Sequence, residues 1–111
     1  MKETQHIRLP KDPVLAAEVK KSPEYRTQEY RKAIQQVLLH DWDPIGVSHI
    51  PGAHDEYEGY DRKVLYYLKA GRPNADIIEY LLHIETDWMG DPTGNYRRAR
   101  AVAKKLKKIK Y

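Results

Sequence analysis

The sequence predicts an all-α fold, a single small bundle of four or five helices joined by short loops. Apolar residues recur at spacings of three and four positions along most of the chain, which is typical of amphipathic helices. No segment alternates apolar and polar side chains in the way a half-buried strand does. A chain of 111 residues has the length of one domain with one modest core, so we expect a single domain over residues 1–111.

The first expected helix belongs to an N-terminal extension, residues 1–22. Asp12 and Pro13 supply an N-cap and a suitable first helical residue. Ser22 and Pro23 interrupt this helix and repeat the start signal, so a second helix should follow and end near residue 39. The apolar face of the second helix consists of Tyr30, Ile34, Val37 and Leu38.

Three further helices are expected in the second half of the chain. The third closes at Gly71, the fourth is capped by Asn74, and the last begins at Asp91-Pro92 and forms a basic C-terminal helix within residues 92–111. Their apolar positions are Tyr57, Tyr60, Val64, Leu65 and Leu68 in the third, Ile77, Ile78, Leu81, Leu82, Ile84, Trp88 and Met89 in the fourth, and Ala99, Val102, Ala103, Leu106 and Ile109 in the last.

The connection between the second and third helices contains two turn signals. The segment DPIG, residues 43–46, matches a type I turn whose aspartate accepts backbone N–H groups, and Pro51-Gly52 suits a type II turn. We therefore expect a compact linker that packs Trp42 and Ile45 onto the bundle.

Charge is distributed by segment. Residues 1–40 carry 8 Lys or Arg against 5 Asp or Glu, residues 41–91 carry 4 against 11, and residues 92–111 carry 8 against none. The acidic middle and the basic end can attract each other or serve partners of opposite charge. The chain lacks cysteine, a signal-peptide pattern and an apolar run of membrane-spanning length, so we expect a cytoplasmic protein that does not bind membranes.

Two carboxylates fall on apolar helix faces and are expected to be buried. Asp61 shares a face with Val64, and Glu85 is flanked by apolar residues of the fourth helix. A buried carboxylate requires hydrogen bonds or a cation, because leaving it unpaired costs several kcal/mol. The nearest candidate cations are Arg97, Arg98 and Arg100. Neither a nucleophile nor a glycine-rich phosphate loop accompanies the carboxylates, so we expect structural ion pairs, with no catalytic residues and no enzyme activity.

A metal site can be drawn between two helices but is not favoured. His54 and Glu58 are four residues apart, as are His83 and Asp87, so each pair would share a helix face. The two helices lack the Glu-x-x-His pairs that two-helix metal sites use, so we predict neither a metal nor another cofactor. His49 and His54 are left without a predicted role.

The chain holds nine tyrosines and no phenylalanine. Tyrosine can fill the rim of a thin core while its hydroxyl stays hydrated, or it can line a recognition surface. The residues to which both interpretations apply are Tyr57, Tyr60, Tyr66, Tyr67 and Tyr80.

The leading hypothesis for function is that the chain binds another protein, one with a basic surface. We expect the chain itself to be a monomer or a weak homo-oligomer. The acidic residues at the start of the third helix also have a structural explanation, because negative side chains there interact favourably with the unpaired N–H groups of the first helical turn. The predicted contact residues in the acidic middle are Asp41, Asp43, Asp55, Glu56, Tyr57, Glu58 and Tyr60.

The alternative hypothesis is sequence-independent nucleic-acid binding by the basic C-terminal helix. The competing structural interpretation is a terminal helix that packs by its apolar edge and leaves its cations in solvent. The residues of the alternative are Arg97, Arg98, Arg100, Lys104, Lys105, Lys107 and Lys108.

Three motifs carry a resemblance over about residues 35–105. They read LLHDWDPIGV, HDEYEGYDRKVLYYLKAG and DIIEYLLHIETDWMG. They resemble a group of small, uncharacterised bacterial all-helical proteins with a WDPIGV-type turn, a DEYD-like helix start and an IE…MG helix end. The resemblance implies a single helical domain and carries no established activity. Proteins of this size and style in some cases lie beside toxin genes, so it also suggests an immunity or accessory role.

Overall fold

The computed structural model describes residues 7–53, 57, 59–88, 90 and 94–110. Within these residues it contains five α-helices and short 3-10 or π turns but no strand, so the predicted all-α class is confirmed. The α-helices are α1 (Pro13–Lys21), α2 (Pro23–Val37), α3 (Tyr60–Lys69), α4 (Asn74–His83) and α5 (Tyr96–Lys107), and the short turns are η1 (Leu38–Trp42), η2 (Pro51–Ala53) and η3 (Ile84–Trp88).

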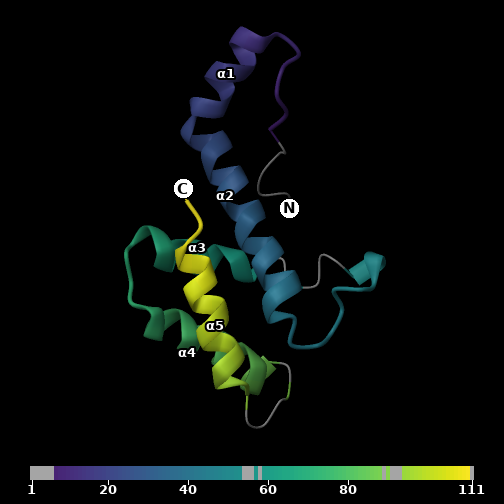
Figure 1. Ribbon diagram of the computed structural model, residues 1–111, viewed down its shortest axis with the longest axis vertical. Helices are drawn as coiled ribbons and strands as arrows, with labels where there is room; N and C mark the ends of the chain where they lie inside the picture. The colour runs from purple at the N-terminus through teal and green to yellow at the C-terminus, as the bar shows by residue number, and fades with distance from the viewer. Residues whose placement is uncertain (1–6, 54–56, 58, 89, 91–93, 111) are drawn as a thin grey trace.

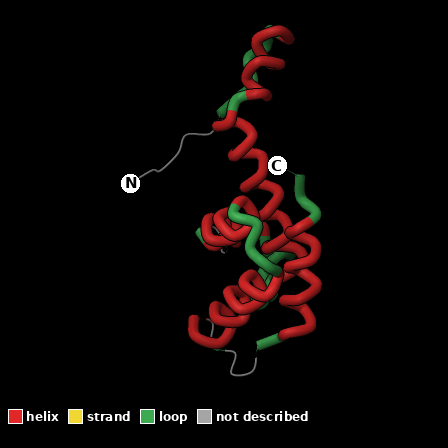
Figure 2. The backbone as a smooth tube through the Cα atoms, turned by 90° about the vertical axis from the view of Figure 1, so that its left-hand side faces the viewer, coloured by secondary structure: helices red, strands yellow, loops and turns green. Residues whose placement is uncertain are grey.

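Helices α1 and α2 begin where the sequence predicts. The Asp12 carboxylate accepts the backbone N–H groups of Val14 and Leu15, at 2.8 and 3.4 Å, and caps α1. Ser22 ends α1, and its hydroxyl accepts the N–H of Tyr25 at 3.2 Å to cap α2. Figures 1 and 2 show that α1 and the start of α2 project away from the other helices. We call residues 7–28 the N-terminal arm.

Helix α2 runs further than the sequence predicts. It continues into the π-helical turn η1, which ends at Trp42, three residues beyond the predicted end near residue 39. Asp43 then adopts a left-handed conformation with φ 35°, and its N–H donates to the carbonyl of Leu38 at 2.9 Å. This left-handed residue ends the helical path and points Trp42 into the bundle.

The linker after Trp42 agrees with the sequence only in part. The N–H of Gly46 donates to the carbonyl of Asp43 at 3.1 Å, as the predicted turn over residues 43–46 requires. The prediction that Ile45 packs onto the bundle is wrong, because its side chain is 46% exposed. The predicted type II turn at residues 51 and 52 is instead the 3-10 turn η2.

The starts of α3, α4 and α5 differ from the predictions. Helix α3 begins at Tyr60, and the acidic cluster predicted for its first turn lies largely outside the described residues. Asn74 is the first residue of α4 and not its cap, which is Pro73 and makes no side-chain capping bond. The predicted start of α5 at residues 91–92 also lies outside the described residues; α5 begins at Tyr96, where the Asn95 side chain accepts the N–H of Arg98 at 2.9 Å.

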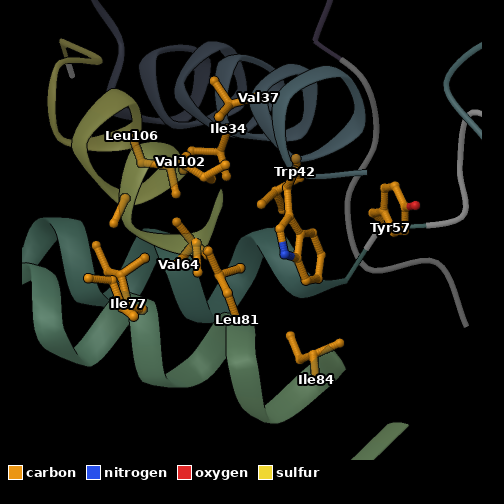
Figure 3. Close-up of a cluster of buried hydrophobic side chains, with 14 of the residues drawn as sticks. Ile34, Val37, Trp42, Tyr57, Val64, Ile77, Leu81, Ile84, Val102 and Leu106 are labelled. Carbon is orange, nitrogen blue, oxygen red and sulfur yellow. The ribbon is translucent and has the colours of Figure 1, made fainter. Parts of the chain in front are cut away.

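The core lies where α2 with η1, α3, α4 and α5 meet. Figure 3 shows side chains from these elements converging around Trp42, which is 1% exposed. The apolar edge of α5 is buried in this core, as the structural interpretation of the C-terminal helix expects. Fully buried aliphatic residues include Ile34, Leu38, Val64, Ile77, Leu81 and Leu106.

Candidate functional site

Glu85 is fully buried, as its position among apolar residues predicts. Its Oε2 atom accepts the indole N–H of Trp42 at 2.7 Å. Its Oε1 atom accepts the backbone N–H of Asn95 at 2.8 Å and lies 3.2 Å from a guanidinium nitrogen of Arg98. Of the three arginines predicted as counterions, Arg98 is the one that forms this pair. Glu85 thus joins η1 to the start of α5 and acts as a structural group.

Gly94 gives Asn95 access to Glu85. It has a φ of 67°, a conformation that glycine adopts without strain. A Cβ atom at this position would lie 3.0 Å from Cδ2 of Leu82 and 3.7 Å from Oε1 of Glu85. The absence of a side chain therefore lets the chain pass close over η3 into α5.

Asp61 is also fully buried. Its Oδ2 atom lies 2.6 Å from the guanidinium Nε of Arg31 and 3.4 Å from the amide nitrogen of Gln35, and its Oδ1 atom accepts the N–H of Gly59 at 3.0 Å. These bonds satisfy the carboxylate from both α2 and the start of α3. Like Glu85, Asp61 is saturated by structural partners, although its cation comes from α2 and not from the C-terminal helix.

Asp43 and Tyr57 were predicted contact residues, but the structure places them in the linker's own hydrogen-bond network. The hydroxyl of Tyr57 donates to Oδ1 of Asp43 at 2.7 Å and accepts the N–H of Ile45 at 3.1 Å. Burial raises the pKa of Asp43, but hydrogen bonds from Tyr57, Val47 and Ser48 outweigh it and hold this pKa below its ordinary value. Tyr57 is 3% exposed, so it belongs to the core and not to a contact surface.

The other predicted acidic contacts have mixed outcomes. Asp41 is exposed, but its Oδ1 atom lies 3.0 Å from the ammonium of Lys105, so it helps to hold α5 against η1. Tyr60 is partly buried, with its ring edge-on to Trp42 at a centroid distance of 6.0 Å. The remaining predicted contacts, which lie outside the described residues, are Asp55, Glu56 and Glu58.

The histidines show no grouping suited to a metal ion within the described part of the chain. Nδ1 of His83 lies 2.7 Å from Oδ2 of Asp87 on the solvent side of the helix, as their spacing predicts. Among the described residues, no three metal-ligating side chains lie close enough to hold an ion. His49 is exposed in the linker, and His54 lies outside the described residues.

An acidic ridge that the sequence analysis missed runs along the outer face of α4 and η3. We define the α4 ridge as Asp76, Glu79, His83 and Asp87, at successive spacings of three, four and four residues. Asp76 pairs with Arg72 at 2.7 Å, whereas Glu79 is exposed and forms no ion pair with the described residues. The sequence signal was present, because Asp76, Glu79 and Asp87 recur at helical spacings in residues 74–88, which contain neither Lys nor Arg.

A tyrosine-lined groove of about 570 Å³ lies between the α4 ridge and α3. The rings of Tyr67 and Tyr80 meet edge-on at 6.0 Å, and the ammonium of Lys63 sits 5.6 Å from the centroid of Tyr67. Burial, with Tyr60, Tyr67 and Asp61 nearby, raises the pKa of Tyr80 to about 12, so its hydroxyl stays protonated at neutral pH. The residues that line this tyrosine groove are Tyr60, Lys63, Tyr67, Asp76, Glu79, Tyr80, His83 and Ile84.

A second groove of about 660 Å³ lies on the other flank of the α4 ridge. Its wall toward α5 is formed by Tyr96, whose side chain is 59% exposed. Both grooves share Asp76, Glu79 and His83, so the ridge is accessible from two sides.

The cations of α5 fall into two groups. Arg98 and Lys105 form the ion pairs described above, and the ammonium of Lys107 donates to the carbonyl of Arg72. The remainder are exposed on one face, at spacings of three and four residues, without an ion pair to the described residues. We define this α5 basic face as Arg97, Arg100, Lys104 and Lys108.

Comparison with known proteins adds no relative: no family model, curated protein or solved structure matches the chain. No helix within the described residues is long and apolar enough to cross a bilayer.

Proposed function

We propose that the chain is a non-catalytic protein-binding domain whose α4 ridge receives a basic segment of another protein. The observation that carries this proposal is the tyrosine groove beside Glu79, which is exposed and has no ion-pair partner among the described residues. Tyrosine supplies large contact area at low entropic cost, and an acidic rim attracts and orients a basic partner.

Lys63 illustrates the kind of group that the groove accepts. Its ammonium lies over the ring of Tyr67, which is the arrangement of a cation–π contact. A lysine or arginine of a partner would find the same aromatic faces, with Glu79 at the rim as a counterion. A protonated Tyr80 hydroxyl adds a hydrogen-bond donor and acceptor to the wall.

The proposal extends to the class of partner. A basic protein such as a nuclease toxin fits the acidic surface, and an immunity or accessory role in the cytoplasm agrees with the resemblance to the WDPIGV-type group. Asp55, Glu56 and Glu58 stay in the proposal as further acidic contacts beyond the described residues.

The proposal is tested by affinity capture from a nuclease-treated extract of the source organism. Immobilised wild-type chain should retain a basic protein, and Glu79→Lys should lose most of it, because the substitution reverses the charge at the centre of the ridge. Asp55→Lys with Glu56→Lys measures the contribution of the acidic segment that precedes α3.

The matched control is Glu29→Lys, which makes the same charge change at an exposed position of α2, outside the N-terminal arm and away from the ridge. All variants should keep the helical circular dichroism of the wild type. Equal capture by the wild type and Glu79→Lys would contradict the proposal.

The α5 basic face favours one second candidate function, nucleic-acid binding. Its four cations extend over residues 97–108, about 17 Å of helix, and could neutralise several phosphates. Tyr96 lies next to this face and is available for base stacking.

A fluorescence titration of single-stranded and double-stranded DNA and RNA over a salt series tests this candidate. Binding should weaken steeply with salt, and Arg100→Glu with Lys104→Glu should abolish it. No binding at low salt, or an affinity indifferent to salt, would eliminate the candidate.

A further inference from the structure

The N-terminal arm contains an α-helix with no buried residue. Among the described elements, α1 packs on α2, and none of the residues of α1 is buried. Isolated helices of 9 residues are marginal in water, so α1 depends on its caps and on a clasp in which the Gln28 side chain bonds both backbone groups of Ile7, at 2.6 and 2.9 Å. These local bonds stabilise the conformation of the arm, but they leave its apolar side chains exposed to solvent.

Exposed apolar side chains gather on this arm. Val14 is 69% exposed, Leu15 is 52% exposed and Leu9 is 38% exposed. The exposed aromatic residues Tyr66 and Tyr96, in contrast, lie near the two grooves that flank the α4 ridge. Two further exposed aliphatic residues, Ile45 and Ile50, lie in the linker, outside any helix. The arm therefore presents an aliphatic surface on a helix, and the surroundings of the ridge present an aromatic one.

The charges of these two surfaces are complementary. Residues 7–28 carry five Lys or Arg against three Asp or Glu, whereas the α4 ridge carries Asp76, Glu79 and Asp87, and residues 74–88 contain no Lys or Arg. Glu85 is not part of this surface, because it is buried. Lys21 lies two helical turns after Val14 and on the same face of α1, so a cation accompanies the exposed apolar residue. The lengths also agree, because α1 spans about 14 Å and the ridge about 16 Å.

A chain cannot bring these two surfaces together by itself. The arm and α4 lie at opposite ends of the molecule, which is 51 Å along its longest axis (Figures 1 and 2). We propose that the arm of one copy docks on the α4 ridge of a second copy, with the two contacts related by a two-fold axis. Val14 and Leu15 would enter the grooves beside the ridge, and Lys20 and Lys21 would face Glu79.

Charge also favours docking of the arm on the ridge of a second copy over a dimer in which two arms contact each other. Two arms would oppose basic surfaces, whereas arm and ridge oppose unlike charges. The contact covers the ridge that the proposed basic partner uses, so self-association and partner capture compete for one surface. With two small contacts, we expect a salt-sensitive dimer with a Kd of roughly 10 µM to 1 mM.

The test is sedimentation velocity over a concentration series at low and high salt. The wild type should dimerise, and Leu15→Asp should weaken the dimer by about tenfold or more, because it removes an apolar contact and places an acid in a groove beside the acidic ridge. An acidic side chain in the first turn of α1 is compatible with the helix, so α1 should persist in this variant. The matched control is Ile45→Asp, at an exposed apolar linker residue that is 46% exposed.

Charge exchange makes the test specific to the arm and the ridge. The double variant Lys20→Glu with Lys21→Glu should be monomeric by itself, and so should the variant Glu79→Lys. An equimolar mixture of the two variants should dimerise. In the mixed dimer, the acidic arm of one chain meets the basic ridge of the other, and the basic arm of the second chain meets the acidic ridge of the first. The proposal is overturned if the wild type stays monomeric at all concentrations, or if the mixture shows no gain over its components. Partner capture by Leu15→Asp separates the two proposals, since it should persist in this variant whether or not the chain dimerises.

Discussion

Glu85 and Glu79 lie six residues apart on the continuous helical path of α4 and η3, yet their environments are opposite. Glu85 is fully buried and bound by Trp42, Asn95 and Arg98. Glu79 is exposed at the rim of a tyrosine groove and has no ion-pair partner among the described residues. The oxygen atoms of the Glu85 carboxylate are bound by groups of the protein itself, whereas the Glu79 carboxylate is accessible to another molecule.

This difference teaches that the role of a carboxylate depends on whether hydrogen bonds and ion pairs from its own chain already occupy its oxygen atoms. The presence of other chemical groups nearby does not decide that role. Asp61 and Asp43 repeat the behaviour of Glu85, since each accepts several hydrogen bonds from its own chain. Removing a saturated carboxylate should destabilise the protein, and removing an exposed one should affect binding alone.

The largest expected effect comes from Glu85→Ala. It leaves the buried indole N–H of Trp42 without an acceptor and Arg98 without its counterion, so we expect a loss of about 3 kcal/mol in the free energy of unfolding. Glu85→Gln retains an acceptor for Trp42 and should lose less. Urea unfolding monitored by circular dichroism measures both, and a loss below about 0.5 kcal/mol in the alanine variant would contradict the structural role of Glu85.

Gly94→Ala should have the next largest effect. The added Cβ meets Leu82 at 3.0 Å and forces a non-glycine residue into a left-handed conformation, so we expect a destabilisation of about 2 kcal/mol. Gly90→Ala is the matched control, because Gly90 has a similar φ of 75° but no atom of the described residues within 4 Å of its Cβ position. Equal losses in the two variants by urea unfolding would show that the close approach to Leu82 is unimportant.

A smaller effect is expected from the acid titration of Asp43. Its pKa is lowered in the folded state, so the stability it contributes is present above the unfolded value of 3.8 and is lost as pH falls through the folded pKa. Tyr57→Phe removes a hydrogen bond to the carboxylate and should move that loss to higher pH. The free energy of unfolding measured between about pH 5 and pH 2 checks this, and identical pH profiles in the two proteins would contradict it.

The smallest effect on stability is expected from Glu79→Lys. Surface substitutions away from a buried network usually change the free energy of unfolding by less than about 0.5 kcal/mol, although this one should strongly reduce partner capture. Thermal unfolding and capture, measured on the same preparation, give both quantities. A large stability loss would show that Glu79 belongs to the fold, as Glu85 does.

Helical periodicity was sufficient to predict the fold and the buried carboxylates. The seam of α5 and the burial of Asp61 and Glu85 follow from spacings of three and four residues, which need no tertiary information. Periodicity does not reveal that Asp43 takes a left-handed conformation or that a π turn carries Trp42 inward, because both depend on packing against distant helices.

The candidate site was less predictable than the fold. The sequence pattern favours the acid-rich segment near residue 43 as the contact surface. In the structure, however, Tyr57 and Asp43 bond each other, and Asp41 pairs with Lys105, which is 64 residues away. The sequence did not single out Glu79 as a contact residue, because an acid four residues before His83 on a strongly apolar helix has the pattern of an ordinary solvent-facing pair. The juxtaposition of α3 and α4 places Tyr60 and Tyr67 beside that residue, which periodicity cannot predict.

Hydrogen–deuterium exchange of the chain with and without its captured partner tests the central claim most directly. The claim is that the interior acids are structural and the α4 ridge is the contact surface. It predicts slower exchange on binding over residues 76–87 and the neighbouring face of α3, with unchanged exchange in η1 and the linker at 43–50. Protection confined to the α5 basic face or to the linker, with α4 unaffected, would contradict it.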